Sequence, residues 1–273
     1  MYLLIHQMKT FYTFLLFILT ISLNAQTFEV EYMLETNRDN PALSYESLYL
    51  LKANKDASVF KPKTKNSLEL YKLDLSDIEI VSENNNLKQV KLGGGPQDFS
   101  YLDIYYNNSN TLVYNRLIVS RLAYVRENDL KFEWEIIEND SKSLLGYKCT
   151  KAVTQFRGRV YEAYFSPDLL TNFGPWKFSG LPGLILSIKS IDGYFSIIAT
   201  SISIKNNLDI INPFKGLETI SLEQFVSDTE KLWLKNLKAI SSNSSGKDDG
   251  GTYTIKFDDS IEDLGIGPII YEY

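Results

Sequence analysis

Residues 172–191 read NFGPWKFSGLPGLILSIKSI, and the rest of the fold is best understood by working outward from this stretch. Its Gly-Pro and Leu-Pro-Gly steps are typical of an ordered loop. Pro182 and Gly183 suit the two central positions of a type II turn, in which the second residue has a positive φ. The apolar run that begins at Leu184 favours a buried strand. The stretch therefore predicts an aromatic-rich loop that leads into a strand.

A six-residue motif inside this stretch carries a resemblance to a known family. The motif consists of Gly180, Leu181, Pro182, Gly183, Leu184 and Ile185. These residues spell the signature after which the GLPGLI family is called, so the chain resembles that family. The residues that lead to the motif, GPWKF at 174–178, are similar to the family as well.

The resemblance extends upstream of the loop. Residues 145–152 (LGYKCTKA), 156–159 (FRGR) and 161–164 (YEAY) look like the hairpin that precedes the signature in the family, so that about residues 145–203 are covered. The segment 167–170 (PDLL) departs from the family, which usually has an Ile-Pro step there. The resemblance implies an extracytoplasmic protein of the Bacteroidetes type with no established activity, and so it supplies no mechanism.

Hairpin signals flank the loop. Asp192 and Gly193 predict a type I′ turn that joins a strand at 184–191 to a strand at 194–204. Arg157 and Gly158 predict a second hairpin turn, between strands at 150–156 and 160–165.

Alternating apolar and polar residues predict further strands earlier in the chain. The clearest alternation covers 130–138, and a turn is expected at 139–143. The other expected strands are 27–35, 45–52, 57–60, 78–81, 87–92, 101–106, 111–119, 121–126 and 252–257. A flexible loop is expected at 93–96, where GGGP lacks the Lys-Ser/Thr step and the helix of a phosphate-binding loop.

The C-terminal part predicts one helix that begins at Ser221. Ser221 is expected to be the N-cap, with Gln224 completing a capping box. An apolar stripe at helical spacing should pack on a sheet; it consists of Leu222, Phe225, Val226, Trp233, Leu237 and Ile240. Many short strands followed by this helix predict a mainly β (β-rich α+β) fold. We expect a single domain at 26–273, a large curved antiparallel sheet or half-open barrel with one amphipathic helix packed on it.

Residues 1–25 have the pattern of a signal peptide. Lys9 precedes an apolar run at 11–23 that is too short for a membrane span. Gln26 is the expected start of the mature chain, with Met8 as an alternative initiator and an uncleaved anchor as the alternative to cleavage. No cysteine follows the run, so no lipid anchor is expected, and no later apolar run reaches about 18 residues. The expected location is extracytoplasmic: the periplasm, the cell envelope or the medium.

Composition excludes several classes of function. The net charge is −6 and the acidic residues are dispersed, which argues against nucleic acid as a partner. The only histidine, His6, lies in the leader, which excludes Ser-His-Asp and Cys-His catalysis and the usual histidine-containing zinc sites. The only cysteine, Cys149, allows no intrachain disulfide and is expected to be a buried apolar residue. We predict no metal, cofactor or catalytic residue.

The candidate ligand-binding residues are Phe173, Trp176, Lys177, Phe178, Arg157 and Arg159. The three aromatic residues lie on a proline-fixed loop, where little entropy is lost on contact with a ligand. They form either a binding platform or a plug at one end of the sheet. The lysine between them either contacts an anionic group or reaches water. The two arginines flank Gly158 and are either exposed turn charges or a contact for an anion or a partner.

Carboxylates are the only acid–base groups abundant enough for catalysis. Glu133 and Glu135 share one face of a strand, as do Glu29 and Glu31, but both pairs alternate with apolar residues and are expected to be solvated. We therefore expect a non-catalytic binding or envelope-associated protein, which holds an apolar ligand or docks on an outer-membrane protein. The alternative is a carboxylate-dependent hydrolase that acts on glycans or peptides.

Overall fold

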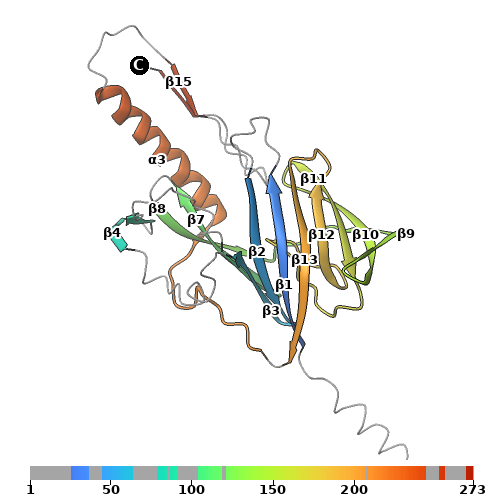
Figure 1. Ribbon diagram of the computed structural model, residues 1–273. Helices are drawn as coiled ribbons and strands as arrows, with labels where there is room; N and C mark the ends of the chain where they lie inside the picture. The colour runs from blue at the N-terminus through green and yellow to red at the C-terminus, as the bar shows by residue number, and fades with distance from the viewer. Residues whose placement is uncertain are drawn as a thin grey trace, which may run out of the picture.

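The computed structural model describes residues 26–36, 45–63, 79–84, 87–91, 104–118, 121–206, 208–243, 252–255 and 269–272. Within these residues, fourteen strands form one open, curved sheet, and one helix packs against it (Figure 1). The predicted mainly β fold with a curved sheet and a packed helix is therefore confirmed. The predicted leader at 1–25 and the glycine loop at 93–96 lie outside the described residues.

The sheet is antiparallel apart from one short strand. Its order is β4-β5-β8-β7-β6-β3-β2-β1-β13-β12-β11-β10-β9, and β14 pairs with β8 in parallel. The strands are β1 (Gln26–Thr36), β2 (Tyr45–Ala53), β3 (Ala57–Pro62), β4 (Glu79–Asn84), β5 (Leu87–Lys91), β6 (Tyr105–Asn108), β7 (Thr111–Ile118), β8 (Arg121–Asn128), β9 (Glu135–Leu144), β10 (Tyr147–Phe156), β11 (Arg159–Ser166), β12 (Leu184–Ser190), β13 (Phe195–Asn206) and β14 (Ile220–Ser221). The end strands β4 and β9 are not joined, so the sheet is open.

Strand β1 lies at the centre of the sheet and joins its two halves. It pairs with β2 on one side and with β13 on the other, from Gln26 opposite Asn206 to Thr36 opposite Phe195. Phe28, Val30 and Tyr32 are fully buried and alternate with Glu29 and Glu31, which face outward, as the sequence predicts. The predicted opening meander β1-β2-β3 is confirmed.

The prediction for residues 130–144 is wrong in its boundaries. Residues 130–134 are outside any strand, and β9 occupies 135–144, including the expected turn at 139–143. The true turn lies at Leu145 and Gly146, whose φ angles of 50° and 85° are those of a type I′ turn. β9 is an edge strand with both faces largely exposed, so its sequence has no apolar alternation to mark it.

The hairpin β12–β13 is confirmed, but its turn is of a different type. A type I′ turn would need positive φ at both Asp192 and Gly193, and only Gly193 has it, at 74°. The Gly193 N–H donates to the Ser190 carbonyl oxygen over 3.0 Å, so Ile191 and Asp192 are the central residues. Gly193 is the additional left-handed residue that follows such a turn in many hairpins.

The turn at Pro182 also differs from its prediction. Gly183 has the expected positive φ, but at 151° it is far from the value of a type II turn. Its N–H donates to the Leu181 carbonyl oxygen over 2.8 Å, which closes a three-residue turn around Pro182. A Cβ on Gly183 would lie 2.1 Å from the Ser166 carbonyl oxygen, so only glycine fits here.

The helix α3 (Leu222–Asn243) begins where the sequence predicts and contacts β8 and β14. The Ser221 hydroxyl accepts a hydrogen bond from the Gln224 N–H over 3.2 Å, which confirms the N-cap. The capping box is not closed, because the Gln224 side chain donates to Asp228 instead. β15 (Thr252–Ile255) and β16 (Ile269–Glu272) form a separate two-stranded sheet, and α3 contacts β16.

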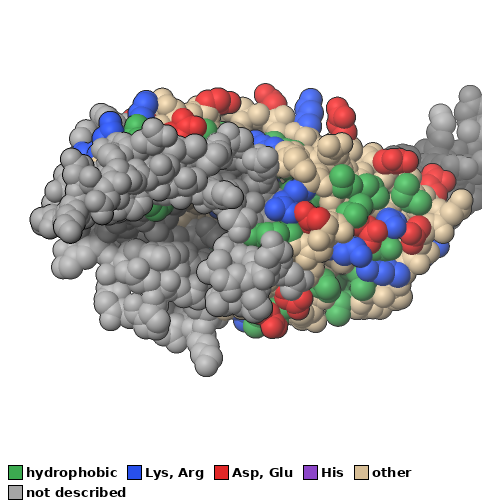
Figure 2. Space-filling model, turned by 90° about the horizontal axis from the view of Figure 1, so that it is seen from above, with side chains coloured by type: hydrophobic (Ala, Val, Ile, Leu, Met, Phe, Trp, Pro, Cys, Tyr) green, Lys and Arg blue, Asp and Glu red, His purple; other side chains and the backbone are tan. Residues whose placement is uncertain are grey.

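One large aromatic core fills the concave side of the sheet. It contains residues from β1, β10, β11, β12, the loop before β12 and the start of α3. Cys149 is buried there, as expected. On the face seen in Figure 2, basic and acidic side chains of the described residues are interspersed. No helix among the described residues is long and apolar enough to cross a membrane.

Candidate functional site

Residues 172–180 form a small hairpin, which we call the plug, between β11 and β12. The Gly180 N–H donates to the Asn172 carbonyl oxygen over 2.7 Å, and the Gly174 N–H donates to the Phe178 carbonyl oxygen over 2.9 Å. Gly174 is required because a Cβ there would lie 2.7 Å from the Ile185 side chain. The tip of the plug, residues 175–178, is buried, whereas Asn172 and Gly180 at its base are exposed.

The aromatic residues of the plug are buried in the core and do not form an exposed platform. Trp176 is 2% exposed, and its ring centroid lies 5.0 Å from that of Phe178 and 6.2 Å from that of Tyr105 on β6. Phe178 packs at 5.0 Å on Tyr161 of β11. The sequence left two alternatives open, a binding platform and a plug, and the geometry is that of a plug. Of the three aromatic residues, Phe173 alone also lines the cavity described next.

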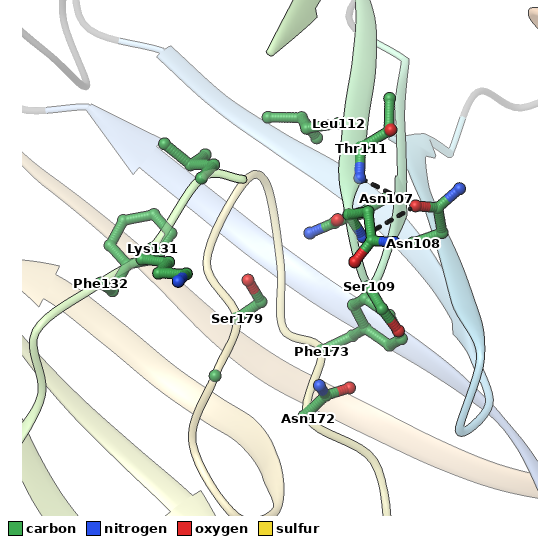
Figure 3. A pocket seen from close by; sticks show the side chains of 13 residues that line it. Asn107, Asn108, Ser109, Thr111, Leu112, Lys131, Phe132, Asn172, Phe173 and Ser179 are labelled. Atoms are coloured by element: carbon green, nitrogen blue, oxygen red, sulfur yellow. Dashed lines mark hydrogen bonds between the residues drawn. The ribbon is translucent and has the colours of Figure 1, made fainter. Parts of the chain in front are cut away.

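That cavity lies between the base of the plug and two neighbouring segments, and its volume is about 260 Å³ (Figure 3). One wall is the turn between β6 and β7, the second is the segment 130–132 and the third is the plug base. The described lining residues are Asn107, Asn108, Ser109, Asn110, Thr111, Leu112, Leu130, Lys131, Phe132, Asn172, Phe173, Ser179 and Gly180.

Hydrogen bonds fix the walls of this cavity. The Asn108 side-chain oxygen accepts from the backbone N–H groups of Asn110, over 3.0 Å, and of Thr111, over 2.8 Å, which holds the β6–β7 turn. Opposite it, the Trp134 indole N–H donates to the Ser179 carbonyl oxygen over 2.8 Å. Two walls of the cavity are therefore held by hydrogen bonds within the protein.

The lining is polar and carries little charge. Most of it is asparagine, serine and threonine, the only charged side chain is the exposed Lys131, and no aspartate or glutamate is among the described lining residues. Among the predicted ligand-binding residues, Phe173 is the one that lines this cavity, and the residues of the other walls were not predicted. The polar run at 107–110, between the strands expected at 101–106 and 111–119, was the available signal for another wall.

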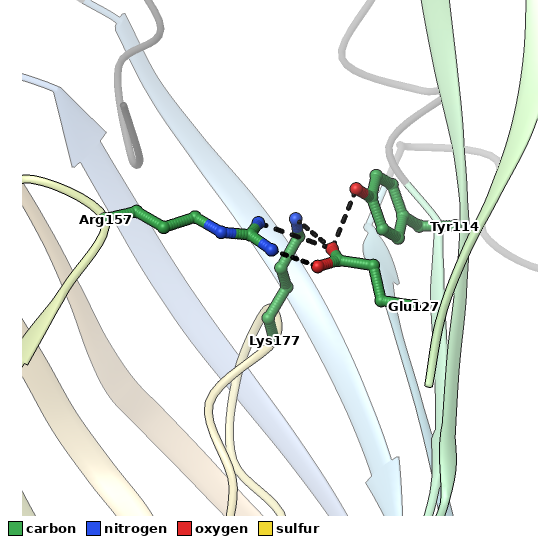
Figure 4. A network of polar contacts seen from close by, with 4 residues as sticks. All are labelled: Tyr114, Glu127, Arg157 and Lys177. Atoms are coloured by element: carbon green, nitrogen blue, oxygen red, sulfur yellow. Dashed lines mark hydrogen bonds and ion pairs between the residues drawn. The ribbon is translucent and has the colours of Figure 1, made fainter. Parts of the chain in front are cut away.

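The tip of the plug brings Lys177 onto a buried carboxylate. The Lys177 ammonium lies 2.8 Å from Glu127 Oε1 on β8, and the Tyr114 hydroxyl on β7 donates to the same oxygen over 2.9 Å (Figure 4). Arg157, at the β10–β11 turn, forms an ion pair with Glu127 Oε2. Lys177 is 0% exposed and Glu127 is 8% exposed. Side chains from three separate parts of the chain therefore meet at one carboxylate.

The electrostatics of this cluster keep Glu127 ionised. Burial by itself would raise the pKa of Glu127, but the charge of Lys177, together with hydrogen bonds from Arg157 and Lys177, lowers it from 4.5 to about 2. A carboxyl group with so low a pKa does not donate a proton near neutral pH, and its oxygens are already occupied. The cluster is suited to hold the plug against β7 and β8, and not to acid–base catalysis.

The remaining predicted residues are engaged elsewhere. Arg159 forms an ion pair with Asp192 of the next hairpin, and its guanidinium lies 4.4 Å from the centre of the Tyr194 ring. The two arginines that flank Gly158 thus point to different partners, one inward and one along the surface. Neither the cavity nor the buried cluster contains Arg159.

The predicted acid pairs lie away from the cavity. Glu29 and Glu31 form ion pairs with Lys52 and Lys63 on the outer face of the sheet. Glu133 and Glu135 are exposed. Within the described part of the chain, no group of three or more His, Cys, Asp or Glu residues is arranged to hold a metal ion.

Comparison with known proteins supports the fold. PNGF-II, solved in two crystal forms, aligns with TM-scores of 0.50 and 0.49 at 16% identity, over 85% of this chain and 35% of PNGF-II. The chain thus spans about a third of the length of that protein, and a likeness of 16% identity shows the fold alone. An outer membrane lipoprotein-sorting protein domain from Vibrio parahaemolyticus aligns over 68% of this chain and 87% of its own length, with 8% identity and a TM-score of 0.27, too low to carry an argument. No family model and no curated protein matches the chain.

Proposed function

We propose that the chain is an exported binding protein of the GLPGLI type that acts without catalysis, and that it binds its ligand in the cavity at the base of the plug. The observation that carries this proposal is the cavity itself, whose walls are fixed by the Asn108 and Trp134 hydrogen bonds. A site that needs no rearrangement loses little entropy on binding.

The arrangement of acidic groups argues against the hydrolase alternative. Hydrolysis of glycans by carboxylates needs two such groups facing each other across the substrate. The described lining of the cavity contains none, and Glu127, the buried carboxylate, is neutralised by two cations. The geometry therefore favours binding over turnover.

The polarity of the cavity favours a polar ligand. An aromatic chain with a curved sheet suggested an apolar ligand inside the sheet, but in the described structure aromatic side chains of the protein itself occupy that interior. The cavity at the rim is lined mostly by amides and hydroxyls. Export is supported by the leader pattern at 1–25 and by the resemblance of 174–185 to the GLPGLI signature.

Native mass spectrometry of the protein purified from its own host tests the proposal. The wild type should carry a bound ligand mass. Ser179→Tyr places a large ring in the cavity and should lose that mass, whereas Ser201→Tyr, the same change on the outer face of β13, should keep it. Circular dichroism confirms that both variants are folded. A wild type without any bound mass, or a folded Ser179→Tyr variant that keeps it, would refute the proposal.

A further inference from the structure

The polar groups that line the cavity have unused hydrogen-bonding capacity. Asn107 is 8% exposed, and its carboxamide makes no hydrogen bond with the described part of the chain. In β6 it lies on the same inward side as Tyr105, and it lines the cavity. Its amide atoms are not among the fully enclosed polar atoms that lack a partner, so they remain accessible from the cavity. A ligand with matching groups would bond to them, which makes Asn107 a recognition group.

The available groups suit hydroxyls better than charges. A carboxamide both donates and accepts, as does a hydroxyl, so each asparagine matches the hydroxyl groups of a ligand in either direction. Asn107 and Asn172 present such groups from two different walls, and the Ser179 hydroxyl lies on the same wall as Asn172. Among the described lining residues Lys131 alone is charged, and its side chain is exposed, so it gives the site no strong preference for an anion.

One wall also offers a rigid apolar surface. Phe132 is half-buried, and its ring centroid lies 4.6 Å from that of Phe156 and 5.2 Å from that of Phe178. These contacts fix the ring, and its remaining surface lines the cavity. A ligand that has an apolar face bordered by hydroxyls would bury that face on Phe132 while the hydroxyls meet the asparagines.

Size and backbone pairing narrow the ligand further. A cavity of about 260 Å³ lies below the usual ~300–1,000 Å³ of small-molecule sites, so it holds about one ring, and the rest of a longer ligand extends into solvent. A peptide that adds as a strand needs an unpaired sheet edge. β6 and β7, which border the cavity, are each paired on both sides.

We propose that the cavity binds one sugar ring of a neutral saccharide, with Asn107 and Asn172 on its hydroxyls and Phe132 against its apolar face. This inference rests on the proposed function, because it names the ligand class of the same cavity. Ring, hydroxyls and low charge together match neutral hexoses and N-acetylhexosamines better than uronic acids, peptides or lipids.

Isothermal titration with short oligosaccharides tests the proposal. The panel contains neutral hexose oligomers, N-acetylhexosamine oligomers, uronic acid oligomers and a set of peptides of similar length. At least one neutral saccharide should bind the wild type. Asn107→Leu should weaken its binding at least tenfold, and Asn172→Ala should weaken it measurably. Asn139→Leu, the same change on the exposed edge strand β9, should leave it unchanged.

Each other outcome overturns the inference in a recognisable way. If Asn107→Leu fails to fold, the Asn172→Ala and Ser179→Tyr variants test the site instead, because Asn172 is exposed. Unchanged saccharide binding by both variants would place the site elsewhere. If no saccharide binds although a ligand mass is lost in Ser179→Tyr, the ligand class is wrong and the proposed function stands. Selective binding of peptides in the cavity also refutes the proposal that the ligand is a saccharide. If no ligand of any kind is found, the proposed function fails as well.

Discussion

At the scale of single residues, Glu127 matters most because two cations depend on it. Lys177 is fully buried, and Arg157 lies at the edge of the same cluster. A buried ion pair gives little net stability, but removal of one partner leaves the other charge buried without compensation. Trp176 adds a cost of its own, because its φ is 57° and its indole N–H is buried without a hydrogen-bond partner in the described structure. The ion pairs and ring contacts of the plug tip offset these costs.

The first prediction concerns the pH dependence of stability. Because the folded-state pKa of Glu127, about 2, lies below its ordinary value of 4.5, the ionised group stabilises the folded state by about 3 kcal/mol above pH ~4.5. That contribution decreases as the pH falls toward 2. Glu127→Gln should therefore lower the free energy of unfolding by about 3 kcal/mol or more at pH 7, and the difference from the wild type should shrink on acidification.

Urea denaturation at pH 7, 5 and 3 measures this difference. Glu133→Gln serves as the control, because Glu133 is exposed and should change the free energy of unfolding by less than about 0.5 kcal/mol at each pH. A difference for Glu127→Gln that stays constant across this range would mean that the carboxylate is not linked to folding.

The sequence allowed part of this cluster to be foreseen. Residues 123, 125 and 127 share one face of β8, but Leu122 and Tyr124 on the other face are buried as well, so alternation in the sequence does not place Glu127 inward. Lys177 was expected to contact an anionic group or water. Its partner could not be identified, because the sequence does not show that residues fifty positions apart meet across a curved sheet.

At the scale of elements, the turns explain which predictions succeeded. The hairpins at Arg157–Gly158 and after Ser190 were located by their glycines, which have φ values of 79° and 74°. The strand at 130–138 was misplaced because Phe132 and Trp134 are apolar for a different reason. Phe132 packs on Phe178 of the plug, and Trp134 bonds to Ser179, while their backbone lies outside the sheet. Alternation therefore marked contact with the plug and not a strand.

The second prediction compares Gly183, where an added Cβ would meet the backbone of another residue, with Gly193, where it would meet open space. Gly183→Ala would place a methyl group 2.1 Å from the Ser166 carbonyl oxygen, so we expect a loss of more than about 4 kcal/mol in the free energy of unfolding, or no folding. Gly193 also has a positive φ, 74° against 151° at Gly183, but open space surrounds the new Cβ, so Gly193→Ala should cost about 1–2 kcal/mol.

Thermal unfolding followed by circular dichroism compares these two variants with the wild type. A much larger loss for Gly183→Ala would show that the approach of Ser166 is what requires glycine. Equal losses in the two variants would attribute both to backbone conformation alone.

At the scale of the whole molecule, β1 limits how far the chain can be shortened at its N-terminal end before it fails to fold. β1 pairs along its length with both β2 and β13, whereas β16 pairs only with β15 in a separate sheet. The curved sheet and its helix could be predicted from many short strands and one capped helix. The strand order could not, because nothing local in 26–36 indicates that its second partner lies at 195–206.

The third prediction follows from this asymmetry. A chain that begins at Gln26 should fold, and if the protein is exported as proposed, mass spectrometry should find Gln26 as its first residue. A chain that begins at Tyr32 loses pairs with both neighbours and should not fold. Removal of 268–273 serves as the control and should leave the large sheet intact, as judged by circular dichroism. A folded chain that begins at Tyr32 would contradict the central role of β1.

The position of β1 also bears on the export that we propose for this chain. Its first strand cannot be enclosed until residues 195–206 are present, and Glu127 has no buried cation until residue 177 follows it. Contacts between such distant residues form late, because a long loop must close first. An emerging polypeptide of this topology should stay unfolded until most of it has been made, which is the state that the proposed export through a narrow channel would require.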